Sequence, residues 1–171
     1  MKKLLDFVAH ALFILFTIAV HLVMVTIFDY PISAINILFI ILILHLLLYE
    51  SLRVVWMSIA VFYILELFVS SPFGVLLFSG TYAIYLAYVL HLNVFPNRNL
   101  VASTLLLFIT LICFRFLYVL FSIFAFLFQE GSPAMGHLVG YAAWELLLTG
   151  LVFLVIYPVV LHILQKRFFI Q

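Results

Sequence analysis

The chain has 171 residues, of which 70% are hydrophobic and only 8% are charged, and its formal net charge is +1. Soluble domains carry roughly 25% charged residues, so this chain has too few charged side chains to cover the surface of a water-soluble fold. The near-neutral charge removes the electrostatic basis for binding nucleic acid. The basic residues are also too scattered along the sequence to predict an anionic-lipid patch. The composition therefore predicts an all-α integral membrane protein embedded in the lipid bilayer.

Six apolar segments are long enough to cross the hydrocarbon core, which takes about 20 helical residues. Their predicted ranges are 7–28, 32–49, 54–70, 75–95, 100–128 and 137–164. The connections between them are short, and the first outer one is expected to be only Asp29-Tyr30-Pro31. We therefore expect residues 1–171 to form a single bundle of six transmembrane helices.

Lysine and arginine are distributed unevenly among the predicted connections. In a six-span chain, six of the seven basic residues fall on one side of the membrane. These residues are Lys2, Lys3, Arg53, Arg98, Lys166 and Arg167. Because basic residues favour the cytoplasmic side, both termini are predicted to be cytoplasmic.

Three ionisable residues lie inside predicted spans: Glu66, Arg115 and Glu145. Each costs about 2.5–3.5 kcal/mol to insert, so each needs a partner or a role. Arg115 and Glu145 fall at similar depth on consecutive spans, about 10 Å below the outer surface at 1.5 Å per residue. We expect these two to pair, with Glu66 as a candidate third member. An ion pair that fixes helix register, a gating or proton-relay group and a contact with a partner protein all remain open.

Histidine offers the only candidate metal ligands. His10, His45, His91 and His162 lie toward the cytoplasmic ends of different spans, yet no two share one span at ligand spacing. Helix packing or an interfacial position is the favoured interpretation, and no metal or cofactor is predicted. The chain also lacks HExxH, GxSxG, Walker A and CxxC patterns. It has no polar stripe of the kind that lines a pore. Neither an enzyme nor a channel is predicted.

Small residues at the start of the last span form a GxxxG pattern, Gly136 to Gly140, extended by Ala143. Such patterns let helices approach closely in lipid. Close packing against a neighbouring helix of the same chain is expected here, with dimerisation as the alternative.

The stretch from Glu66 to Gly74 carries a resemblance to a known family. It is similar to the acidic-Leu-Phe-x-Gly/Ser-x-Pro-x-Gly stretch of the bacterial rod shape-determining MreD family. Thr81 to Tyr88 resembles that family's next helix, and Pro96-Asn97-Arg98 resembles the basic turn that follows. The last span, from Glu145 to Leu164, is also similar. Glu66 stands where aspartate is usual, and Ser70 stands where glycine is common.

The resemblance implies a non-enzymatic scaffold subunit of the bacterial cell-elongation machinery, in the cytoplasmic (inner) membrane. Its expected partners are an MreC-like bitopic protein and the complex of a glycan polymerase with a class B penicillin-binding transpeptidase. The residues Ser71, Pro72 and Gly74 are then expected to form a tight outer turn that matters for this role.

An alternative comes from the substrate-capture subunits of energy-coupling-factor vitamin transporters, which have a similar six-span fold. Those subunits usually carry a long first outer loop and small-xxx-small patterns on the first helix. Here the first outer loop is expected to be short. The alanines Ala9, Ala11 and Ala19 do not fall at the required spacing.

Overall fold

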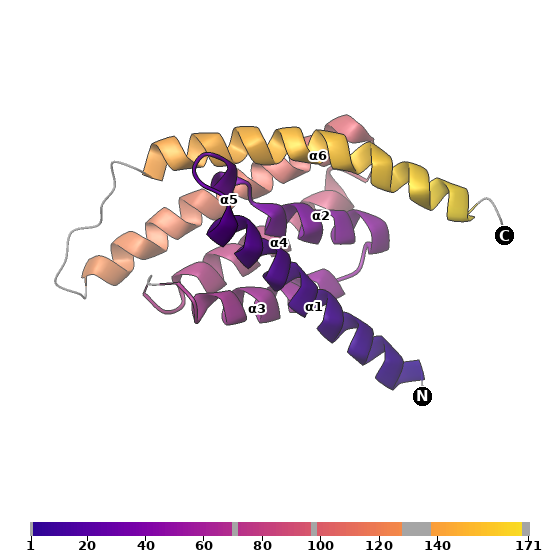
Figure 1. The fold of residues 1–171 in the computed structure, drawn as a ribbon, viewed down its shortest axis with the longest axis horizontal. Helices are drawn as coiled ribbons and strands as arrows, with labels where there is room; N and C mark the ends of the chain where they lie inside the picture. The colour runs from indigo at the N-terminus through magenta and orange to yellow at the C-terminus, as the bar shows by residue number, and fades with distance from the viewer. Residues whose placement is uncertain (1, 70–71, 97–98, 128–137, 169–171) are drawn as a thin grey trace.

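The computed structural model describes residues 2–69, 72–96, 99–127 and 138–168, and these ranges contain six α-helices, one short 3-10 helix and no strand (Figure 1). In chain order the elements are α1 Lys2–Ile27, η1 Ile32–Ala34, α2 Ile37–Tyr49, α3 Arg53–Glu66, α4 Val75–Asn93, α5 Leu100–Leu127 and α6 Leu138–Phe168. The predicted all-α membrane fold is confirmed.

Five segments of the described chain are long and apolar enough to cross a membrane. They are Val8–Ile27, Ile32–Tyr49, Val75–Asn93, Leu100–Ala125 and Gly140–His162. The third predicted span differs, because α3 has only 14 residues and ends at Glu66 instead of residue 70. At 1.5 Å per residue it is about 21 Å long, shorter than the hydrocarbon core of about 30 Å. The described residues between α3 and α4, which are 67–69 and 72–74, belong to no helix.

The first outer connection also differs from the expectation. It runs from Phe28 to Asn36 and includes η1, because α2 begins at Ile37 instead of residue 32. The Asn36 side chain caps α2 by accepting a hydrogen bond from the Phe39 N–H at 3.4 Å. The segment from Ile32 to Tyr49 is a candidate span, as predicted, but its first residues form η1 and the N-cap instead of α2, and they can contribute to a site at this end.

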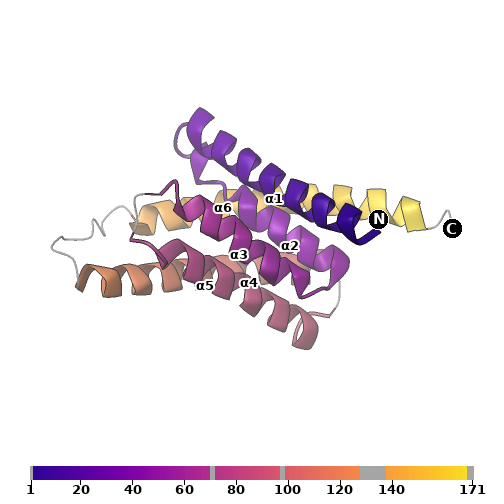
Figure 2. The same cartoon turned by 90° about the horizontal axis from the view of Figure 1, so that it is seen from below.

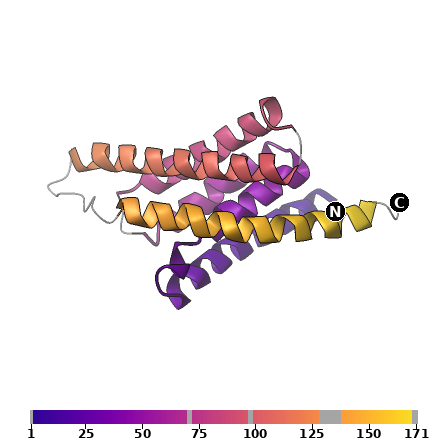
Figure 3. The same ribbon diagram turned by 90° about the horizontal axis from the view of Figure 1, so that it is seen from above.

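Consecutive helices run in alternating directions through the bundle (Figure 2). The start of α1, the α2–α3 turn and the end of α6 therefore lie at one end of the molecule (Figure 3). We call this the basic end, because the terminal turns gathered there include Lys2, Lys3, Arg53, Lys166 and Arg167. The opposite end, which holds η1 and the α3–α4 connection, is called the distal end.

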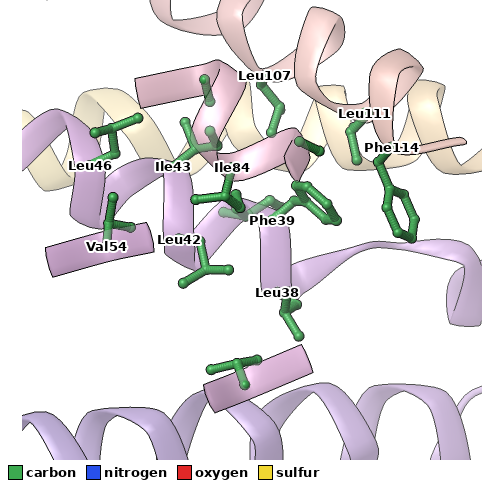
Figure 4. Packing of buried hydrophobic residues seen from close by; sticks show 14 of the residues in the cluster. Leu38, Phe39, Leu42, Ile43, Leu46, Val54, Ile84, Leu107, Leu111 and Phe114 are labelled. Carbon is green, nitrogen blue, oxygen red and sulfur yellow. The ribbon is translucent and has the colours of Figure 1, made fainter. Parts of the chain in front are cut away.

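Helix α2 forms the centre of the core. Seven of its 13 residues are buried, as expected for a helix that is apolar on all sides. Figure 4 shows its side chains meeting Ile84 of α4 and Phe114 of α5. The Phe39 ring lies 4.9 Å from the Phe114 ring and 5.8 Å from the Phe62 ring of α3, between centroids. In lipid such packing is a main source of helix association, so these contacts hold α3 and α5 on α2.

Close helix approach occurs at glycines other than the predicted pair. Gly136 lies outside the described residues. Gly140 and Ala143 are exposed, and a Cβ added at Gly140 would meet no atom within 4 Å. The prediction of close packing within the chain is therefore wrong at Gly140. By contrast, a Cβ at Gly80 would lie 2.4 Å from Cζ of Phe62, and one at Gly150 would lie 2.5 Å from Cζ of Phe108.

The topology leads to a labelling prediction. Cys113, the single cysteine of the chain, is first replaced by serine. In this background, Asp29→Cys at the distal end should react with an impermeant thiol reagent added outside intact cells. Asn93→Cys, at the end of α4 near the basic end, should react only after permeabilisation. Both wild-type residues are exposed, so neither substitution disturbs the core. Labelling of both cysteines from outside would rule out this topology.

Candidate functional site

Glu66 joins the end of α3 to the start of α4. Its carboxylate is 4% exposed and accepts three backbone hydrogen bonds. The N–H groups of Gly74 and Leu76 donate to Oε1 at 2.9 and 3.1 Å, and the N–H of Leu77 donates to Oε2 at 2.7 Å. The first N–H groups of a helix have no partner within the helix and carry partial positive charge. Glu66 therefore caps α4 from a neighbouring helix.

The tight turn predicted from proline and glycine lies directly before α4. Gly74 has φ +98°, a left-handed conformation that only glycine adopts without strain, and it forms the N-cap of the helix. The carbonyl of Pro72 accepts a hydrogen bond from the Val75 N–H at 3.3 Å. Ser71 lies outside the described residues. The positive φ aims the Gly74 N–H back at Glu66, so the turn and the carboxylate form one unit.

Arg115 of α5 and Glu145 of α6 are in contact. Arg115 Nε donates to Glu145 Oε2, and the Glu145 side chain is 1% exposed. The guanidinium also lies over the Tyr141 ring, 5.1 Å from its centroid. Glu66 is not a third member of this pair, because both of its oxygens accept from the start of α4. The structure thus separates the three predicted ionisable residues into two sites.

Asn36 completes the second site and was missed by sequence reasoning. Its Nδ2 donates to Glu145 Oε1 at 2.6 Å, and its backbone N–H donates to the buried Thr149 hydroxyl at 2.9 Å. These bonds tie the start of α2 to α6. The signal was present in the sequence, since an asparagine directly before a long apolar run is a typical N-cap.

A cavity of about 510 Å³ opens beside this site, toward the distal end of the bundle. Apolar side chains from α1, α3 and α5 form much of its wall. Its polar lining comes from His21, Ser33, Asn36, Arg115, Tyr141 and Glu145. The Tyr141 hydroxyl also donates to the Ser33 carbonyl at 3.4 Å, which holds α6 against η1. The cavity combines an apolar wall with the guanidinium of Arg115, which is paired with Glu145. Such an arrangement can hold a small amphipathic molecule.

Of the four histidines considered as metal ligands, His10 and His45 line one cavity, and His91 and His162 lie elsewhere. His91 Nε2 is 3.4 Å from Glu50 Oε1, and the His45 ring packs between Phe13 and Tyr49. His162 is exposed at the end of α6. Among the described residues, no three His, Cys, Asp or Glu side chains are grouped closely enough to hold a metal ion.

Comparison of the chain with protein-family models, with curated proteins and with solved structures gives no match.

Replacing Glu66 tests its capping role. Glu66→Leu leaves one buried and two partly buried N–H groups without an acceptor, so we expect a loss of about 2–3 kcal/mol in the free energy of unfolding. Glu66→Gln keeps one carbonyl acceptor and should lose about half as much. Unfolding in mixed micelles with increasing sodium dodecyl sulfate measures both values. Equal stability of the Leu and Gln variants would contradict the capping role.

The second site predicts a non-additive pair of substitutions. Arg115→Leu leaves Glu145 buried without its cation and should cost about 3–5 kcal/mol. Adding Glu145→Leu removes that uncompensated charge, so the double variant should be more stable than the sum of the two single variants implies. The same unfolding assay applies. Strict additivity would mean that the two side chains do not interact.

Proposed function

We propose that this protein is a non-enzymatic scaffold subunit of the bacterial cell-elongation machinery, similar to the MreD family, in the cytoplasmic membrane. The observation that carries the proposal concerns the stretch from Glu66 to Gly74, on which the resemblance rests. This stretch forms one hydrogen-bonded unit at the distal end, built from the carboxylate, the turn and the start of α4. The acidic residue and the glycine of the sequence pattern are thus the two residues that form the cap of α4.

The use of the buried acidic groups supports a scaffold over an enzyme. Both oxygens of Glu66 accept backbone hydrogen bonds, and both oxygens of Glu145 accept bonds from Asn36 and Arg115. A general acid or base must be able to reach the proton that it transfers. Glu66 lines neither described cavity, and Glu145, which lines one, already accepts the bonds that hold α2 and α5 to α6.

The same unit presents an apolar surface at the distal end. Leu67, Phe68 and Phe73 flank the capped turn, and all three side chains are exposed. Exposed aromatic side chains on either side of a hydrogen-bonded helix cap are suited to anchoring a partner protein. In the predicted orientation this end faces outward, where the juxtamembrane segment of an MreC-like bitopic partner would begin. Such a partner, with the polymerase and transpeptidase beside it, is the assembly that we propose.

A matched pair of variants tests this contact. Phe73→Ser and Trp56→Ser remove side chains of equal exposure, 69% and 68%, from opposite ends of the bundle. We expect Phe73→Ser to reduce the amount of a bitopic partner that co-purifies from the native membrane by about tenfold or more, as for an anchor worth at least 1.4 kcal/mol. Trp56→Ser should leave it unchanged. Native mass spectrometry of the extracted complexes measures both amounts.

Equal loss of the partner in both variants, or no partner in the wild type, would contradict the scaffold proposal.

The cavity beside Arg115 favours a second candidate, a substrate-capture subunit of an energy-coupling-factor vitamin transporter. A volume of about 510 Å³ fits a vitamin-sized molecule, and the longer first outer connection forms part of its wall. The same native mass spectra separate the two candidates. A stoichiometric small molecule without a protein partner would favour capture over the scaffold.

A further inference from the structure

A second cavity, of about 490 Å³, lies at the basic end between α1, α2 and α3. Its wall includes His10 and Phe13 of α1, His45 and Tyr49 of α2, and Ser51 and Arg53 from the α2–α3 turn and the start of α3. It is separate from the cavity beside Arg115, with which it shares no lining residue. The site and the proposed function described above do not involve it.

The described residues that line this cavity include three basic side chains and no carboxylate. They are His10, His45 and Arg53, accompanied by the hydroxyl groups of Tyr49 and Ser51. Every one of these groups can donate a hydrogen bond. The lining is therefore suited to a ligand that carries negative charge and several acceptor oxygens.

The two charged residues of the α2–α3 turn, Glu50 and Arg53, point in opposite directions. Glu50 ends α2 in a left-handed conformation, φ +47°. Its carboxylate lies 3.4 Å from Nε2 of the buried His91 on α4. Arg53, three residues later, lines the cavity. The turn thus directs the carboxylate toward α4 and leaves the guanidinium on the cavity side.

The aromatic residues hold the His45 ring in the cavity wall. Its centroid lies 5.0 Å from that of Phe13 and 4.7 Å from that of Tyr49. A ring packed between two others has little freedom to turn away. The position of this donor is therefore set before any ligand arrives, which lowers the entropic cost of binding.

The cavity lies at the ends of candidate spans, the level at which phospholipid headgroups are expected. It is formed at the end of α2 and the start of α3, where the chain leaves the apolar spans. Exposed apolar side chains flank it, with Val8 and Leu12 on α1 and Trp56 on α3. These surfaces suit acyl chains, and tryptophan favours the level of the headgroups. A water-soluble phosphate compound has no acyl chains that could contact these flanking surfaces.

We propose that this cavity binds the phosphate headgroup of an anionic phospholipid of the inner leaflet. The Arg53 guanidinium pairs with two phosphate oxygens as a planar fork. His45, Tyr49 and Ser51 donate to the remaining headgroup oxygens. The acyl chains lie along the exposed faces of α1 and α3. Basic pockets between helices on the cytoplasmic side are a recognised way to bind anionic headgroups.

Native mass spectrometry of the delipidated full chain tests the proposal. Phosphatidylglycerol, phosphatidylcholine and inorganic phosphate are titrated separately. We expect one phosphatidylglycerol molecule to bind at least fivefold more tightly than phosphatidylcholine. Arg53→Gln should weaken phosphatidylglycerol binding by about fivefold, the usual contribution of one basic residue near an anionic membrane. Arg53→Lys keeps the charge but not the planar fork, so its binding should lie between that of the wild type and that of Arg53→Gln.

The controls separate this site from general charge effects and from misfolding. His162→Gln removes an exposed histidine at the same end of the bundle and should not change binding. Arg53 is itself exposed, so its substitution should not unfold the chain. As a second measurement, phosphatidylglycerol at one fixed concentration should raise the melting temperature most for the wild type, less for Arg53→Lys and least for Arg53→Gln.

Equal phosphatidylglycerol binding by the wild type and Arg53→Gln would overturn the site. Inorganic phosphate that binds as tightly as phosphatidylglycerol would overturn the lipid assignment.

Discussion

The absence of water inside a bilayer is the constraint on which this structure depends. A backbone N–H exposed to hydrocarbon costs several kcal/mol, so every interruption of a helix must be satisfied by the protein itself. Here α3 stops about 9 Å short of a full crossing, and α4 starts after a left-handed glycine. That arrangement is stable because the Glu66 carboxylate accepts the N–H groups that the start of α4 leaves unpaired.

The same constraint explains the second polar site. Glu145 sits on a helix of the bundle, is almost completely buried, and is matched by one donor on α5 and one before α2. Three elements distant in sequence are thereby fixed in register at the distal end. Because each Glu145 oxygen already accepts one of these bonds, the groups left for binding at this end lie in the neighbouring cavity and on the exposed turn.

Hydropathy was sufficient to predict the helices, and depth along consecutive spans placed Arg115 near Glu145. The failures have physical causes. Hydropathy does not reveal where a helix breaks within an apolar segment, so the end of α3 at Glu66 and the 3-10 turn at the start of the Ile32–Tyr49 span were not predicted. Small residues permit close packing without requiring it, and the close contacts formed at Gly80 and Gly150, where a phenylalanine of another helix is present. Glu66 was predicted to join Arg115 and Glu145, but its partners are backbone N–H groups, and a sequence does not show which N–H groups lie near a side chain.

At the basic end, too, the fold brings together residues that are far apart in the sequence. Counted along the sequence, lysine and arginine are too dispersed to suggest lipid binding. The fold brings Arg53 beside two histidines from other helices, while Glu50 is turned toward α4. An anionic headgroup in that cavity would be attracted by the residues that predict a cytoplasmic location for this end. Orientation in the membrane and headgroup binding would then share one electrostatic origin, because Arg53, which contributes to the predicted cytoplasmic position of the α2–α3 turn, would also hold the lipid.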